Sequence, residues 1–341
     1  MSNLTFQLSS CSINVDRNEG TKLIFNLCFF VPVNFILSVS VLFGNVLILV
    51  ALQDVLILHP PSKLLFRCLS STDLCVGLIS QPVFIVYLFT IANKKWNWFC
   101  GLSETLAYIS SALLCGESIT TLTAMSVDRL LALLLGLRYR TVVSFKRVLT
   151  FVITSWISNF ALAMTYFFNK RFFFSLCCIC IASCLCTSTC CYAKIYTILH
   201  HKQAHIHENT QNTNRGGVSF MNMERYKRTV SGALYVNLTL VVCYVPYTVT
   251  VAVSIVYGKT SANVIAWNIA ATVVYINSLL NPFLYCWKLR EVRQVVEGKL
   301  RKWLCFQWKK AFICNSGICF VSFIGKCMCS SFRFIFCTRK D

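Results

Sequence analysis

The stretch SALLCGESITTLTAMSVDRLLALLLGLRYR, residues 111–140, indicates how this chain is organised. It stays apolar for several helical turns and ends in an adjacent acid and base, Asp128 and Arg129, followed by leucines and a basic cluster. One stripe of the helix, at steps of three or four residues, holds Ser111, Cys115, Ser118, Leu122, Met125 and Arg129. Ser118 and Arg129 lie roughly 16 Å apart along this stripe. Their polar atoms need partners, which we expect the rest of the chain to supply.

The composition is that of a membrane protein. Of the 341 residues, 56% are hydrophobic and 13% are charged, whereas soluble domains carry about 25% charged residues. Seven segments are long enough to cross about 30 Å of hydrocarbon as helices. They lie near 25–53, 62–91, 100–135, 147–168, 172–200, 225–257 and 262–287. This predicts an all-α membrane protein, a bundle of seven transmembrane helices occupying residues 25–287.

The basic residues show how the bundle lies in the membrane. With these spans, 25 of the 32 Lys and Arg residues fall on one side. Basic loops stay in the cytoplasm, so we predict an extracellular N-terminus (1–24) and a multi-pass protein of the plasma membrane. The net charge of +20 could suggest nucleic acid, but its distribution argues against such a partner.

The segments outside the spans carry further predictions. Residues 202–224 are polar and predict a cytoplasmic loop. Residues 288–304 alternate charged and apolar side chains, which predicts an amphipathic eighth helix on the inner lipid surface. The Cys- and Phe-rich tail, 305–341, predicts palmitoylation at Cys305; the alternative is a tail without defined structure. Asn3 begins a glycosylation sequon on the predicted outer side.

One carboxylate, Asp73 in LSSTDLCVGL, lies in the middle of a span and needs hydrogen-bond partners. The candidates on other spans are Asn45, Ser118, Asn277 and Asn281. Oxygen atoms of this kind could hold a hydrated Na⁺ beside Asp73, because a hard cation takes oxygen ligands. The alternative is a water-filled polar network without an ion. A second buried acid, Glu117, is expected to face the fourth span in a structural hydrogen bond.

Two prolines, Pro246 and Pro282, each remove a backbone hydrogen bond and are expected to kink their helices. Kinked helices around a polar centre can have two packings, as a switch requires. Tyr192 and Tyr285 are expected near the cytoplasmic ends of the fifth and seventh spans, at the depth of Arg129.

Seven motifs, in order on seven spans, carry a family resemblance. They are GN at 44–45, LSSTD at 69–73, SVDRL at 126–130, Trp156, Tyr192, CYVP at 243–246 and NPFLY at 281–285. Over roughly residues 25–304 the chain resembles the rhodopsin-like (class A) G-protein-coupled receptors. LRYR at 137–140 and the short turn at 168–171 look similar to the melanocortin and adenosine branch, as found in simple animals.

The resemblance implies a heterotrimeric G protein as the partner. Arg129 would be restrained by Asp128 at rest and freed when helix six swings outward. It would then contact the Gα subunit, with Tyr192 and Tyr285 nearby. Leu137, in the second cytoplasmic loop, would also meet the G protein. The polar set around Asp73 would be an allosteric sodium site.

The chain departs from the family pattern at several positions. Tyr244 stands where the family has the tryptophan of its CWxP toggle. The cysteine expected at the start of helix three would fall at Glu104, so the family disulfide is in doubt. Cys100 with Cys177 or Cys178 is the alternative.

The resemblance also places a ligand pocket. Ser111 takes the position where amine receptors have an aspartate, which argues against a monoamine held by an ion pair. The cavity-facing set would be Glu104, Tyr108, Ser111, Ala112, Cys115, Tyr244, Tyr247, Thr248, Trp267, Ala271 and Tyr275. It is mostly apolar and aromatic, which suits a small neutral or lipid-like ligand; the alternative for each ring is simple packing.

Three other functions fit the sequence less well. No Gly-rich phosphate loop, nucleophile elbow or zinc-hydrolase motif is present, so we expect no enzyme and no cofactor besides Na⁺. A transporter usually shows two related halves and broken helices around a central site, and the sequence shows neither. The unusual tail and the missing cysteine leave a receptor-like protein that no longer signals as the alternative.

Overall fold

The computed structural model describes residues 17–54, 59–92, 97–212, 216–258, 261–288, 292–299 and 301. Every long element among them is a helix. In chain order they are α1 (Arg17–Asp54), α2 (Pro60–Cys75), the π-helical η2 (Val76–Ser80), α3 (Gln81–Ala92), α4 (Asn97–Leu135), the 3-10 turn η4 (Gly136–Arg138), α5 (Tyr139–Val142), α6 (Phe145–Phe168), α7 (Lys170–Asn212), α8 (Gly216–Tyr257) and α9 (Ser261–Lys288).

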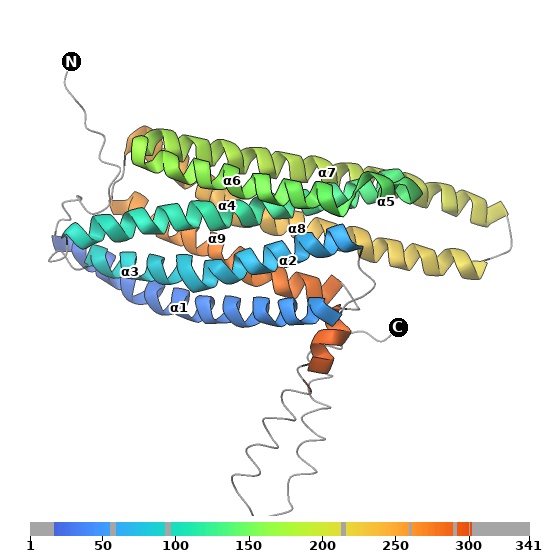
Figure 1. Ribbon diagram of the computed structural model, residues 1–341, viewed down its shortest axis with the longest axis horizontal. Coiled ribbons are helices and arrows are strands. Elements are labelled where there is room, and N and C mark those ends of the chain that lie inside the picture. Colours follow the sequence, from blue (N-terminus) through green and yellow to red (C-terminus); the bar gives the residue numbers. More distant parts are fainter. Residues whose placement is uncertain are drawn as a thin grey trace, which may run out of the picture.

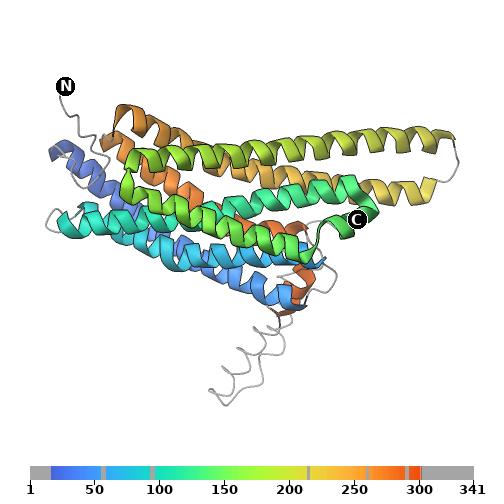
Figure 2. The ribbon, with the colours of Figure 1, turned by 45° about the horizontal axis from the view of Figure 1, so that its top comes forward.

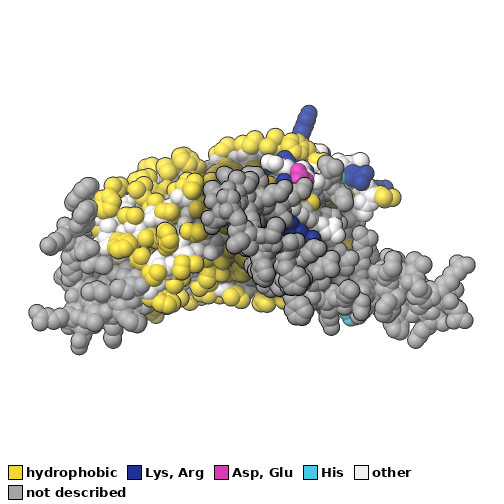
Figure 3. Space-filling model, turned by 90° about the horizontal axis from the view of Figure 1, so that it is seen from below, with side chains coloured by type: hydrophobic (Ala, Val, Ile, Leu, Met, Phe, Trp, Pro, Cys, Tyr) yellow, Lys and Arg dark blue, Asp and Glu magenta, His cyan; other side chains and the backbone are white. Residues whose placement is uncertain are grey.

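The prediction of a seven-helix membrane bundle is confirmed. Seven stretches within the described residues are long and apolar enough to cross a bilayer. They are Phe29–Asp54, Pro60–Ile91, Phe99–Val142, Phe145–Phe168, Lys170–His201, Asn237–Tyr257 and Asn263–Leu284. Large hydrophobic side chains such as Phe35, Ile157 and Ile179 point outward and are more than 60% exposed. Figure 3 shows hydrophobic side chains covering much of one face, with the visible Lys and Arg side chains near one end.

The helix that contains the opening stretch, α4, lies inside the bundle. It contacts α2, α3, α6, α7 and α9. In Figure 1, α1 to α3 lie on one side of it and α6 and α7 on the other, and Figure 2 shows the same grouping after a turn. The ring closes where α1 packs against α9 and α8 packs against both α7 and α9.

The second span is one continuous helical rod with a π-helical turn in its middle. The N–H of Gln81 donates to the carbonyl of Val76, five residues back instead of four. Pro82 follows directly and has no N–H to continue the α-helical ladder, which accounts for the wider turn at this place.

At the same turn the backbone of η2 lies against α1. The Ser38 hydroxyl donates to the carbonyl of Gly77 at 2.7 Å. A Cβ atom at Gly77 would lie 3.0 Å from Val41 Cγ1 and 3.3 Å from the Ser38 carbonyl oxygen. Only a glycine allows this approach, so the residue sets the distance between the first and second spans.

Two connections are short and are closed by single residues. Asn169 alone joins α6 to α7: its N–H caps α6 at the Thr165 carbonyl, and its Oδ1 accepts from the Phe172 N–H at 3.1 Å. At the other end of the bundle, Gly136 takes a φ of +52°, the left-handed conformation that favours glycine. This turn ends α4 and brings α5 back alongside it.

Some expectations were wrong at the ends of the spans. Residues 202–212 and 216–224, predicted as a loop, continue α7 and α8 as helices (Figure 1). The first helix begins at Arg17, inside the expected N-terminal segment. Cys100 is disulfide-bonded, but Cys177 and Cys178 are free, so the alternative pairing with either of them is wrong.

The eighth helix, predicted over 288–304, is helical over 292–299. Val292 and Val296 are buried against the main core. Lys299 Nζ lies 2.8 Å from Asp54 Oδ2, which ties this helix to the end of α1. Asn3 and Cys305 lie outside the described residues, so glycosylation and palmitoylation stay predictions.

We predict that Gly77→Ala destabilises the bundle, by about 1–3 kcal/mol, because the new methyl group overpacks η2 against α1. Gly101→Ala on α4 is the matched control, since a Cβ atom there meets nothing within 4 Å. Alanine is the better helix former, so the control variant is expected to be at least as stable as the wild type. Thermal unfolding of the purified variants measures both; equal melting temperatures would contradict the proposed close contact.

Candidate functional site

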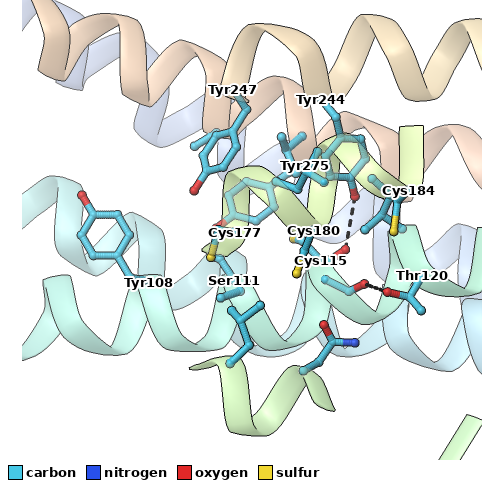
Figure 4. Close-up of a pocket in the computed structure, with 18 of the residues that line it drawn as sticks. Tyr108, Ser111, Cys115, Thr120, Cys177, Cys180, Cys184, Tyr244, Tyr247 and Tyr275 are labelled. Carbon is cyan, nitrogen blue, oxygen red and sulfur yellow. Dashed lines mark hydrogen bonds between the residues drawn. The ribbon is translucent and has the colours of Figure 1, made fainter. Parts of the chain in front are cut away.

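A cavity of about 80 Å³ lies between α4, α6, α7, α8 and α9 in the outer half of the bundle (Figure 4). Because one water needs about 10–15 Å³ by this measure, the space holds several waters or a slender group of atoms. No charged side chain is among the described residues that line it. The lining is therefore suited to a neutral ligand.

Nine of the eleven pocket residues proposed from the sequence line this cavity: Tyr108, Ser111, Ala112, Cys115, Tyr244, Tyr247, Trp267, Ala271 and Tyr275. The hydroxyls of Ser111 and Tyr275 lie 2.7 Å apart and join α4 to α9. At the toggle position, the Tyr244 hydroxyl donates to the carbonyl of Cys115 at 3.3 Å, so α8 is also tied to α4 at this depth (Figure 4).

The other two proposed pocket residues do not line the cavity. Glu104 is fully buried within the helix packing at the outer end of α4. The Thr248 hydroxyl donates to the carbonyls of Tyr244 and Val245 on its own helix, and this leaves the side chain bonded to α8. Helical spacing gives the face of a residue only within a fraction of a turn, which explains both errors.

Sequence reasoning missed the flank of the cavity formed by α6 and α7. Asn159 and Leu162 line it from α6, and Cys177, Cys180 and Cys184 line it from α7. The three cysteines recur at steps of three and four residues, so they share one face of α7. That spacing was visible in the sequence, but it does not tell a pocket face from a packed one.

The polar centre lies deeper in the bundle. Asp73 is fully buried and accepts two hydrogen bonds from other spans. Ser118 Oγ donates to Asp73 Oδ1 at 2.9 Å, and Asn281 Nδ2 donates to Asp73 Oδ2 at 2.7 Å. The carboxylate therefore joins α2, α4 and α9 at one point.

Two other members of the predicted polar set make no hydrogen bond to Asp73. Asn45 Nδ2 donates to the carbonyls of Val41 and Ser278, which ties α1 to α9. Its Oδ1 and the Nδ2 of Asn277 are buried without a hydrogen-bond partner among the described residues. Buried polar atoms of this kind ordinarily find a water or an ion. The polar set around Asp73 can thus hold a water molecule or a small ion.

Glu117 faces α6, as expected for a structural hydrogen bond. Ser155 Oγ donates to Glu117 Oε1 at 2.7 Å and Asn159 Nδ2 donates to Oε2 at 2.9 Å. Asn159 also lines the cavity, so this pair fixes the orientation of one pocket amide.

The expected restraint of Arg129 by Asp128 is wrong for this structure. The Asp128 carboxylate accepts hydrogen bonds from Ser62 Oγ at 2.9 Å and from the Tyr139 hydroxyl. The ion pairs found among the described residues do not include one between Asp128 and Arg129. The Arg129 guanidinium lies 5.8 Å from the centre of the Phe66 ring and is exposed. The turn at Gly136 brings Tyr139 to Asp128, which sequence spacing alone did not indicate.

Other residues proposed for the switch lie at the same end of the bundle as Arg129. Tyr192 is buried in a small cluster with Ile195 and Leu199. Leu137 is 98% exposed. The side chain of Tyr285 lies outside the described part of the chain. The helices α8 and α9 run through Pro246 and Pro282 without a break, and Pro282 packs against Gly44.

Comparison with known proteins agrees with this geometry. The family model described as "7 transmembrane receptor (rhodopsin family)" matches residues 44–173 and 168–285. The human protein named olfactory receptor 4L1 is 33% identical over 132 residues, which cover 39% of this chain and 41% of that protein. The D(2)-like dopamine receptor of Takifugu rubripes is 29% identical over 131 residues, 38% of this chain and 27% of that receptor.

The matched stretch is thus less than half the length of either relative. The family model, however, spans most of the seven-helix bundle and more than half of the chain. The chain belongs to the rhodopsin family of seven-transmembrane receptors.

Proposed function

We propose that this receptor binds a small extracellular or membrane ligand in the cavity and passes the signal to a heterotrimeric G protein at the opposite end of the bundle. The observation that carries this proposal is the arrangement along α4. Ser111 and Cys115 line the cavity, Ser118 bonds to Asp73, and Arg129 is exposed at the far end. One rigid helix therefore connects the cavity, the polar centre and the proposed coupling surface.

The coupling surface is proposed to be the end of the bundle at which Arg129 and Leu137 are exposed. Leu137 is almost fully exposed, unusual for a large apolar side chain outside the lipid belt, and it directly precedes the basic residues Arg138 and Arg140. An apolar anchor beside positive charge suits the acidic and apolar surface of a partner protein. The excess of basic residues on this side supports a cytoplasmic location, with the N-terminus outside the plasma membrane.

The finer place within the family is also a proposal. The LRYR motif at 137–140 and the single-residue connection at Asn169 support the melanocortin and adenosine branch. None of the described residues that line the cavity is charged, which supports a small neutral or lipid-like ligand and argues against an ion-paired amine.

We predict that Arg129→Ala abolishes ligand-free nucleotide exchange on a purified Gα subunit, because the variant lacks the exposed cation proposed to contact it. Lys146→Ala, which removes an exposed cation at the start of α6, is the matched control and should keep wild-type exchange. The assay measures binding of a non-hydrolysable guanine nucleotide to each Gα class in vesicles. Exchange that is absent from the wild type for every class would indicate a receptor-like protein that no longer signals.

We also propose that the centre around Asp73 binds Na⁺. The fully buried carboxylate supplies oxygen ligands and negative charge, and the unpartnered Asn45 Oδ1 is a further acceptor among the buried atoms of this layer of the bundle. Ser118 would then serve both the carboxylate and the ion. The alternative occupant is water alone.

Replacing KCl by NaCl at equal ionic strength is therefore expected to raise the melting temperature of the wild-type receptor, by about 2–4 °C for each kcal/mol of Na⁺ binding. Asp73→Asn and Ser118→Ala should lose this difference. Ser110→Ala is the control on the same helix, since its hydroxyl only donates to the Ala107 carbonyl. Equal melting temperatures of the wild type in both salts would leave water as the occupant.

A further inference from the structure

The outer end of the cavity is closed by stacked aromatic rings. Tyr108 from α4, Phe174 from α7 and Trp267 from α9 meet edge to face, with ring centroids 5.2 to 5.6 Å apart. Tyr166 and Phe173 extend the stack at the α6–α7 turn. All five side chains are buried. A ligand coming from the outer aqueous phase would have to separate these rings before it reached the cavity.

The flank between α6 and α7 is more open than this aromatic cap. Of the lining residues there, Cys180 is exposed, and Asn159, Leu162 and Cys184 are partly exposed. In Figure 4, Cys184 lies at the end of the cavity away from Tyr108, and Cys180 lies at its middle, beside Cys115. The adjoining outward side chain, Ile179, is 63% exposed and faces the position of the hydrocarbon core. The cavity thus reaches the lipid side of the bundle at mid-membrane depth.

We propose that the ligand enters this cavity from the bilayer, between α6 and α7, and that it is a neutral single-chain amphiphile with a hydroxyl or amide group at its inner end. This inference rests on the proposed function, in which the cavity is the ligand site. The aromatic cap then stays closed during binding and separates the ligand from the outer water.

Two polar side chains of the cavity can bond to the ligand. In Figure 4 the Tyr247 hydroxyl points toward the side of Tyr108, and no hydrogen bond joins it to another described residue. Asn159 Nδ2 donates a hydrogen bond to Glu117, which orients the amide. Its Oδ1 then lies against Gly116, 2.8 Å from the position that a Cβ atom on Gly116 would take. The Asn159 carbonyl can accept a hydrogen bond from a hydroxyl or amide at the inner end of the ligand, and the Tyr247 hydroxyl offers a second polar contact nearer the aromatic cap.

The size of the cavity defines the rest of the ligand. About 80 Å³ accommodates a polar head and a few carbon atoms, but not a long chain. A chain attached to that head has to leave the cavity, and the flank beside Cys180 leads directly to lipid. An apolar chain there remains in hydrocarbon and loses no favourable solvation. A single-chain amphiphile therefore fits the site, with its polar head in the cavity and its chain in the surrounding lipid.

The test uses a photoreactive hexadecanol, with a diazirine on one of the first carbon atoms beside its hydroxyl, in phosphatidylcholine vesicles that contain the full-length receptor. After illumination, the labelled peptides are identified by mass spectrometry. We expect adducts on the α4 peptide around Cys115 and Gly116 in the wild type. Cys180→Phe places a ring in the flank and should lower this labelling about tenfold through overpacking.

The matched control is Cys186→Phe, which adds the same ring to an exposed cysteine of α7 that does not line the cavity. It should label like the wild type. Leu162→Phe narrows the same flank from α6 and serves as the second blocking variant if Cys180→Phe unfolds. Unchanged labelling in a folded blocking variant would overturn the proposed route.

A second probe separates the two entry routes in the wild type itself. A short water-soluble alcohol with the same diazirine is added outside the vesicles. Labelling of the α4 peptide by this probe, without labelling by the bilayer probe, would overturn entry from lipid. Neither measurement needs a G protein, so failure of this inference is distinguishable from failure of receptor signalling, which nucleotide exchange reports.

Discussion

A carboxylate buried in the middle of a membrane bundle is the constraint on which this structure depends. Asp73 is fully buried, and a group of this kind is costly in the hydrocarbon region unless other polar atoms surround it. Ser118 and Asn281 supply the donors from α4 and α9. Removal of either donor leaves a buried acceptor unpaired, which costs more than the hydrogen bond itself contributes. Three spans are therefore held in one relative position by one side chain.

The same helix, α4, carries a cross-contact at each further level. Near the cavity its Ser111 and the Cys115 carbonyl meet tyrosines of α9 and α8. At the far end Asp128 accepts from Ser62 of α2 and from Tyr139. A ligand that displaces the tyrosines acts on the helix that also holds Asp73 and Arg129. This continuity of hydrogen-bonded contacts along one helix is the physical basis that a two-state switch needs.

Much of the fold could be predicted from the sequence because the hydrocarbon core imposes simple rules. Length and hydropathy located all seven spans, and most of their predicted ends lie within a few residues of the observed ones. The meeting of Asp73 with Ser118 and Asn281 was also predicted, since few polar side chains lie at the depth of a carboxylate in the middle of a span. The family motifs then showed which helix of the receptor bundle each span corresponds to.

The errors occurred where a local turn or a neighbouring side chain decides the outcome. Asp128 bonds to Ser62 and Tyr139, instead of Arg129, because the left-handed turn at Gly136 returns the chain to α4. Asn45 bonds to the Ser278 carbonyl and not to Asp73, because a backbone carbonyl is also an acceptor and the pattern of polar side chains does not reveal it. The open flank beside Cys180 could not be predicted either: helical spacing gave the face of α7, but not how closely α6 approaches it.

The central claim is that the cavity and the coupling surface belong to one switch. The most direct test measures the distance between two spin labels by pulsed electron paramagnetic resonance. The labels are attached to genetically encoded keto amino acids that replace Leu134 of α4 and Leu238 of α8, both of which are exposed. The account predicts that addition of a nucleotide-free G protein lengthens this distance, because α8 moves away from α4. It also predicts that Asp73→Asn changes the fraction of molecules with the longer distance. One unchanged distance with and without the G protein would contradict the account.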